Sequence, residues 1–145
     1  MIKLAGGGGW NMNAVLYESR IRSLLDSRLV GWTVDAVQLF GSNLLCTVLV
    51  VQFSSSHQAQ KTDANPKVDN WVEEVNEELK LGPRKRVHTQ KRLLVITPGA
   101  AYGPSADYIR KSRIRLSTTH KHTLQRWKNV EMFQVWLDRL DFSEE

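Results

Sequence analysis

The feature that most constrains the fold is an apolar run from Leu44 to Phe53, LLCTVLVVQF, interrupted only by Thr47 and Gln52. Successive side chains of a strand point to opposite faces, so a strand that is apolar on both faces must be covered on both sides. The run is also far shorter than the roughly 18 residues that an apolar helix needs to cross a bilayer. We therefore expect a central strand in a sheet that is covered on both faces.

Two further strands are expected beside this one. Residues from Gly31 to Gly41 are β-formers bounded by glycines, and the short turn at Gly41–Asn43 makes this strand antiparallel to the apolar run. Leu93 to Thr97 is a short apolar segment that comes after a helix, so a crossover places it parallel to a neighbour. Simple alternation in the first strand predicts two faces: Trp32, Val34, Ala36, Gln38 and Phe40 on one, and Thr33, Asp35, Val37 and Leu39 on the other.

Three helices are indicated by apolar residues at helical spacing. Asn13 can cap a helix that runs to about Leu29. The clearest helix has Asn65 as its N-cap and Pro66 at its first position, and Gly82–Pro83 stop it. A third amphipathic helix is expected near the C-terminus; its predicted range is about Asn129 to Leu140.

The residues between the last strand and the last helix are less regular. Pro98 to Pro104 is rich in turn-forming residues and predicts a loop. After it, Ser105 can cap a short helix that reaches Ser112, whereas the alternation of RIRLS, Arg113 to Ser117, is typical of a strand. Both elements cannot extend through the same residues, so the sequence leaves the two open.

These elements predict an α/β or α+β fold with a central mixed sheet flanked by helices, in the order α-β-β-α-β-α. A chain of 145 residues with 41% hydrophobic composition has the usual size of one domain. We expect a single layered domain over residues 12–145. The segment 1–11 contains GGGG and is expected to be a flexible leader.

Basic residues are concentrated in one part of the chain. Between Arg84 and Lys128, twelve Lys and Arg stand against one acid, Asp107, which gives a local charge of +11 in a chain of net charge +5. Clustered cations attract phosphates by Coulomb energy and by counterion release. The leading hypothesis is a non-catalytic domain that binds RNA or DNA through these residues: Arg84, Lys85, Arg86, Lys91, Arg92, Arg110, Lys111, Arg113, Arg115, Lys121, Arg126 and Lys128. The alternative is a solvated basic surface that meets an acidic protein.

Aromatic residues are interleaved with these cations. Tyr102, Tyr108 and Trp127 could stack on unpaired bases. Packing in the core is the more common role of such residues, and we expect it above all for Trp127, which adjoins an apolar helix.

The order of elements over residues 16–97 resembles the core of the PD-(D/E)xK nuclease-like fold. In that resemblance Glu18 matches an acid of the first helix, Asp35 in GWTVDAV matches the first strand acid, and Val50-Val51-Gln52 occupies the acid-x-lysine position. Val50 offers no oxygen ligand where the family has its metal-binding acid. The resemblance therefore implies a degenerate nuclease-like domain that is used for binding.

A second hypothesis keeps the family's activity. A metal-dependent nuclease would use Glu18, Asp35 and Gln52 as catalytic candidates, with Mg²⁺ or Mn²⁺ and a further acid; a binding domain needs no cofactor. The other interpretation of these three residues is structural. Glu18 would lie on a solvated helix face, Asp35 would be exposed at a sheet edge, and Gln52 would be bonded to the serine-rich loop that follows it.

A third hypothesis is a protein-interaction or oligomerising subunit, in which apolar helix faces that include Trp71 and Trp136 meet a partner or a second copy. Cys46 is the only cysteine, which excludes an internal disulfide and a cysteine metal cluster. His120 and His122 are too few to indicate a metal site. We expect an intracellular protein, cytoplasmic or nuclear, with no membrane partner.

Overall fold

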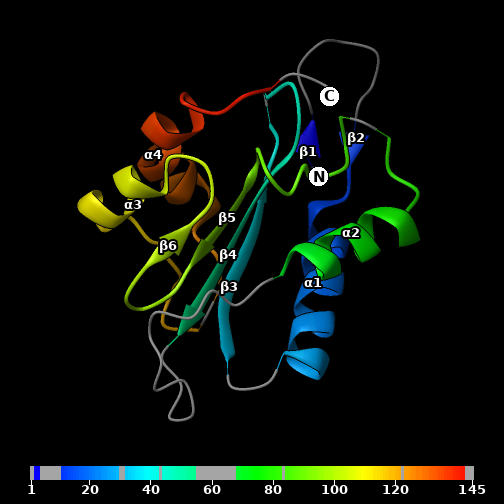
Figure 1. Ribbon diagram of the computed structural model, residues 1–145, viewed down its shortest axis with the longest axis horizontal. Coiled ribbons are helices and arrows are strands. Elements are labelled where there is room, and N and C mark those ends of the chain that lie inside the picture. Colours follow the sequence, from blue (N-terminus) through cyan, green and yellow to red (C-terminus); the bar gives the residue numbers. More distant parts are fainter. Residues whose placement is uncertain are drawn as a thin grey trace.

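The computed structural model describes residues 2–3, 11–29, 32–42, 44–54, 68–82, 84–121 and 123–142. Within these residues the chain forms an α/β domain, with four helices packed on an open, mixed, four-stranded sheet (Figure 1). Its elements follow the order α-β-β-α-β-β-α-α. The predicted fold class is confirmed.

The four strands of the sheet are neighbours in chain order. They are β3 (Thr33–Phe40), β4 (Val48–Ser54), β5 (Leu93–Ile96) and β6 (Ala101–Tyr102). β4 is antiparallel to β3 and parallel to β5, and β6 is antiparallel to β5. The antiparallel pair and the parallel crossover expected from the sequence are both confirmed.

Helices cover both faces of this sheet (Figure 1). α1 (Ala14–Arg28) and α2 (Asp69–Glu78) pack on one face. α3 (Ala106–Ser112) and α4 (Arg126–Leu137) pack on the other. The sheet is therefore the middle layer of three.

Strand β4 lies at the centre of this arrangement. Leu49, Val51 and Phe53 belong to the apolar cluster on the α1–α2 side, and Val48 and Val50 belong to the cluster on the α3–α4 side. All five side chains are fully buried. The second half of the apolar run, from Val48 to Phe53, is thus the covered central strand that its composition predicts, whereas Leu44 to Thr47 lie outside the strand.

A bulge in β3 changes which side chains share a face. The register against β4 shifts between Val34 and Ala36, so Asp35 is an extra residue without a paired partner. Val34 therefore packs with Val37 on the α1–α2 side, and Trp32 packs on that side as well. The prediction that Trp32 and Val34 share a face with Ala36 was wrong, because simple alternation does not hold across a bulge.

The segment predicted as a loop contains a short strand. Ala101–Tyr102 form β6, which pairs with the end of β5 after the turn at Pro98 and Gly99. The strand is only two residues long, so it gives no periodic signal. Gly103 follows it with a φ of 137°, a conformation that glycine alone adopts readily.

Helix α1 agrees with its predicted range, whereas α2 has Val68 as its N-cap and ends at Glu78, before the predicted stop at Gly82–Pro83. Asn13 caps α1, because its side-chain oxygen accepts a hydrogen bond from the Leu16 backbone N–H at 3.0 Å. The predicted start of α2 at Asn65–Pro66 lies outside the described residues. α2 is followed by Lys80, whose φ of 52° is left-handed.

The last two helices differ from expectation in detail. The helix through Ser112 is present, but Ser105 has a left-handed φ of 52° and makes no side-chain capping bond, and no strand follows at 113–117. α4 begins and ends three residues earlier than predicted. Asn129 lies inside α4 and is buried, because its side chain bonds to the Gln38 side chain and to the backbone of Ser117.

Most of the predicted leader lies outside the described residues. Its described parts, β1 (Ile2–Lys3) and β2 (Asn11–Met12), pair with each other in an antiparallel manner, and the flexibility of the leader stays a prediction. Across the described ranges, no helix is long and apolar enough to cross a membrane.

The turn after β6 gives a stability test. A Cβ added to Gly103 would lie 2.4 Å from the Leu93 carbonyl oxygen, which belongs to the backbone of β5. We expect Gly103→Ala to lower the free energy of unfolding by about 2 kcal/mol or more, because both the clash and the positive φ oppose it. Gly82→Ala is the matched control, since its Cβ would meet no atom within 4 Å. Equal urea midpoints for the two variants would contradict the described turn.

Candidate anion-binding site

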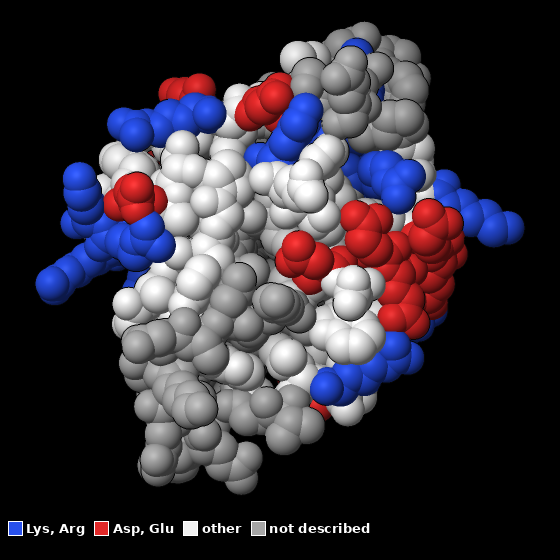
Figure 2. All heavy atoms as spheres, viewed as in Figure 1, with Lys and Arg blue, Asp and Glu red and all other residues white. Residues whose placement is uncertain are grey.

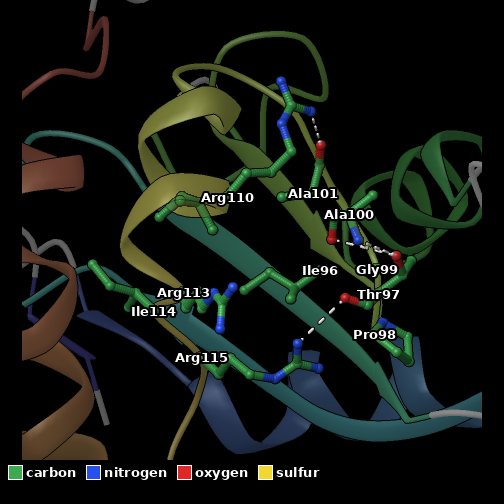
Figure 3. Close-up of a pocket in the computed structure, with 11 residues that line it drawn as sticks. Ile96, Thr97, Pro98, Gly99, Ala100, Ala101, Arg110, Arg113, Ile114 and Arg115 are labelled. Carbon is green, nitrogen blue, oxygen red and sulfur yellow. Dashed lines mark hydrogen bonds between the residues drawn. The ribbon is translucent and has the colours of Figure 1, made fainter. Parts of the chain in front are cut away.

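An open pocket of about 410 Å³ lies at the carboxyl end of β5 (Figure 3). It is formed by the β5–β6 turn, by α3 and by the segment that follows α3; residues 96–101, 109–110 and 113–115 line it. Three of these residues are arginines, and none is an acid. We call this site the arginine pocket.

The three arginines are held in different ways. Arg115 donates to the carbonyl oxygens of Thr97 and Phe53 at 3.3 and 3.4 Å, so its guanidinium joins the residues at the ends of β5 and β4. Arg110 turns toward the Ala101 carbonyl, to which it donates at 2.8 Å, and it also pairs with Asp107 outside the pocket (Figure 3).

The side chain of Arg113 is not held by a hydrogen bond to a backbone carbonyl among the described residues. Its backbone is left-handed, with φ 54°, and caps α3 by donating its N–H to the Ile109 carbonyl. Its exposed side chain makes no hydrogen bond or ion pair within the described part of the chain. In Figure 3 its guanidinium lies beside Ile96 and on the same side of the pocket as Arg115. A guanidinium presents a planar fork of donors that suits the oxygens of phosphates and carboxylates.

A second, smaller pocket of about 260 Å³ contains two of the catalytic candidates. Glu18 of α1 and Asp35 of the β3 bulge both line it, together with Arg22 and Arg126. We call this site the Glu18 pocket.

The carboxylate of Glu18 is already paired. Glu18 is only 7% exposed, and it accepts a hydrogen bond from the Leu39 backbone N–H at 2.7 Å. Both terminal nitrogens of Arg126 donate to its two oxygens. These hydrogen bonds raise the pKa of Arg126, against the lowering effect of burial. The expectation of a solvated helix face for Glu18 was wrong, because α4 brings Arg126 against it.

Gln52 and Asp35 are joined directly. The Gln52 amide nitrogen donates to Asp35 Oδ2 at 2.7 Å and to the Leu116 carbonyl at 3.3 Å, and its oxygen accepts from the Leu116 N–H at 2.7 Å. The described partners of Gln52 are thus Asp35 and Leu116, whereas Ser55 and Ser56 of the loop expected to bond to it lie outside the described residues. Leu116 lies 64 residues further along the chain, beyond the reach of local sequence reasoning.

These groups do not fit a divalent cation. The oxygens of Glu18 are occupied by Arg126, and Val50 is fully buried in the apolar cluster beneath α3 and α4. Across the described residues, no group of three or more His, Cys, Asp and Glu side chains is placed to hold a metal ion. His122 lies outside them, and His120 is exposed. The Glu18 pocket thus brings together Glu18 and Asp35, but the described residues supply no free set of metal ligands there.

The twelve Lys and Arg of the predicted basic surface have unlike surroundings. Five are paired or buried: Arg86 with Glu73 and Glu77, Lys91 with Asp141, Arg110 with Asp107, Arg126 with Glu18, and Arg92, which is buried and donates to the Asp141 carbonyl. Five others make no side-chain hydrogen bond or ion pair among the described residues: Lys85, Lys111, Arg113, Lys121 and Lys128. Arg115 binds the two carbonyls named above, and Arg84 is half-buried. In Figure 2 basic side chains gather over α3, and acidic ones gather over α2.

Two residues near these sites were not anticipated from the sequence. Arg22, one helical turn after Glu18, lines the Glu18 pocket and donates to the Val34 carbonyl at 3.0 Å; its spacing from Glu18 on α1 is the signal that could have identified it. Trp127 was expected in the core, but its side chain is 83% exposed.

Comparison with protein-family models, with curated proteins and with solved structures gave no match for this chain. What the structure supports of the resemblance is therefore its coarse form, a mixed four-stranded sheet covered by helices.

The Gln52 contacts lead to a second stability test. Gln52→Leu leaves the Leu116 N–H buried without its acceptor, so we expect the free energy of unfolding to fall by about 1–3 kcal/mol. Gln134→Leu is the matched control, because this glutamine is exposed on α4 and bonds only to nearby Asp138. Urea titration of both variants measures the difference, and a Gln52 variant as stable as the control would refute the inferred bond.

Proposed function

We propose that the protein binds nucleic acid without cleaving it, and that phosphates are bound at the arginine pocket. The observation that supports this proposal is the pocket itself: three arginines line it, no acid does, and the Arg113 guanidinium makes no hydrogen bond or ion pair with another described group. Such a site attracts anions and holds them by charge-assisted hydrogen bonds.

The way the arginines are held favours binding at low entropic cost. Arg115 and Arg110 are bonded to backbone carbonyls, so their positive charges are fixed before a ligand arrives. Arg113 then has its donors available for the ligand. Phosphate of a nucleic acid is the ligand that we infer, and an acidic protein segment is the competing outcome of the test.

The proposed interface is narrower than the predicted set of twelve residues. Lys111 and Arg113 are its centre, Arg115 supplies fixed charge, and Lys121 and Lys128 are candidates for contacts further along the strand. Arg86, Lys91 and Arg126 are paired with acids, which lowers the net positive charge near them.

The resemblance to the PD-(D/E)xK nuclease-like core is consistent with binding without cleavage. We infer a nuclease-like core whose catalytic corner has become structural, because Arg126 neutralises Glu18 and the Gln52 amide engages Asp35. Because the Arg126 guanidinium occupies the oxygens of Glu18, these residues are suited to stabilising the fold and not to binding a metal ion for hydrolysis.

Salt dependence tests the proposed binding. We expect the affinity for labelled RNA or DNA strands to fall steeply with ionic strength, as measured by fluorescence anisotropy. Lys111→Gln with Arg113→Gln removes two proposed phosphate contacts, so the slope of log K against log salt should flatten by about 1.4–1.8.

A control with the same loss of charge separates contact from net charge. Arg28 and Arg86 both pair with glutamates of α2, so Arg28→Gln with Arg86→Gln should change the slope far less. If the slope of log K against log salt flattens equally in both double variants, the change comes from the lower net charge of the protein and not from lost phosphate contacts at Lys111 and Arg113. A wild-type protein that binds acidic polypeptide but no strand at low salt would overturn the proposal.

A cleavage assay tests the absence of catalysis. The protein is incubated with a labelled strand and Mg²⁺ or Mn²⁺, and Asp35→Ala is run in parallel. We expect no more cleavage from the wild type than from the variant. Cleavage that the Asp35 substitution abolishes would instead establish the nuclease hypothesis.

A further inference from the structure

Trp127 is the most exposed large apolar side chain within the described residues. It is 83% exposed, whereas Val15, Leu16, Leu45 and Val135 range from 43% to 61%. A tryptophan buries more apolar area than almost any other side chain when it packs, so leaving it in water is unusual in a folded domain. Its exposure therefore needs an explanation.

The fold itself holds this indole outside. Trp136 is fully buried under α4 and follows Trp127 by nine residues, which is about two and a half helical turns, so the two side chains lie on opposite sides of the helix. The rotation of α4 is fixed by Asn129, whose buried amide donates to Gln38 at 2.8 Å. Trp127 cannot turn toward the core while these contacts exist.

Two cations flank Trp127 in the chain, Arg126 and Lys128, and the first turn of α4 contains no acid. Arg126 is paired with Glu18, and Glu131 lies one helical turn after Trp127, so Lys128 is the cation beside the indole that can meet a ligand. Lys128 makes no side-chain hydrogen bond or ion pair within the described ranges. A polyanion is thus favoured near the indole over an acidic or neutral partner.

Hydrogen bonds connect this turn of α4 with the arginine pocket. Ser117, two residues after Arg115, accepts from the Gln125 N–H at 2.9 Å and donates its own N–H to the Asn129 side chain at 2.6 Å. The residues that bracket Trp127 are therefore bonded to the segment that leaves the pocket. The position of the indole relative to the pocket is therefore fixed by these bonds.

The other two aromatic candidates are less suited to stacking. The ring of Tyr108 is covered by the Arg139 guanidinium at 4.6 Å, and Tyr102 is half-buried in β6 against the α1–α2 cluster. Of the three aromatics interleaved with the basic residues, Trp127 is the one with an open face.

We propose that Trp127 stacks on an unpaired base, so that the ligand is single-stranded nucleic acid and not a duplex. This inference rests on the proposed function and adds the class of strand. Bases of a duplex have both faces covered by their neighbours, whereas an unpaired base can place one face on the indole. Stacking tolerates any base, so the protein binds single strands with little sequence preference.

The test compares four probes at one ionic strength: a mixed-sequence single strand, the same strand with abasic sites, its duplex, and heparin as a polyanion without bases. Trp127→Ala should weaken binding of the intact single strand by roughly 5- to 100-fold. Binding of the abasic strand, the duplex and heparin should change less than about 2-fold. Trp127→Phe should restore most of the affinity, because it keeps an aromatic face.

Val135→Ala is the matched control, since Val135 is another exposed apolar residue of α4, and it should leave all four affinities unchanged. Equal losses of Trp127→Ala on intact and abasic strands, or no loss on either, would overturn the stacking inference while the proposed function remains. Concentration-dependent self-association that Trp127→Ala abolishes would assign the indole to an interface between two copies and overturn it as well. A wild type that binds none of the four probes would overturn both proposals.

Discussion

The side-chain amide of Gln52 joins the centre of the sheet to the segment between α3 and α4. It sits on β4, is 2% exposed, and satisfies both backbone groups of Leu116 as well as one oxygen of Asp35. A buried N–H without an acceptor is costly, so this amide restricts where the segment can lie. Arg115, the last residue that lines the arginine pocket, immediately precedes Leu116, and Asp35 lines the Glu18 pocket. Both pockets therefore adjoin residues that the same side chain holds.

The positive charge of the arginine pocket has a structural origin. Backbone carbonyl groups near the ends of strands need hydrogen-bond donors, and Arg115 donates to one such group just after β5 and to another near the end of β4. Arg110 does the same for Ala101 in β6. Cations that donate to carbonyl groups of the sheet thus also establish a field that attracts anions. Arg113 is the arginine of the pocket's lining that makes no hydrogen bond or ion pair among the described residues.

The sequence predicts the layers well, because covered strands and amphipathic helices leave periodic patterns that local physics explains. The apolar run at 44–53 and the crossover to β5 are examples. It does not predict features set by distant partners: the Leu116 contact of Gln52, the Arg126 contact of Glu18, or the two-residue strand β6. Trp127 was missed because its helix begins three residues earlier than its apolar pattern indicates, and the true rotation of α4 depends on the buried Asn129 amide.

The 64-residue separation between Gln52 and Leu116 has a consequence for how the protein folds. Contacts between distant parts of a chain form late, because their loop-closure entropy must be overcome first. The arginine pocket is complete only when the segment after α3 has docked, because Arg113 and Arg115 belong to that segment. A ligand held there binds only the finished fold, so by mass action it shifts the folding equilibrium toward the complete domain. Slower amide hydrogen exchange at residues 113–117 would then indicate that a ligand occupies the pocket.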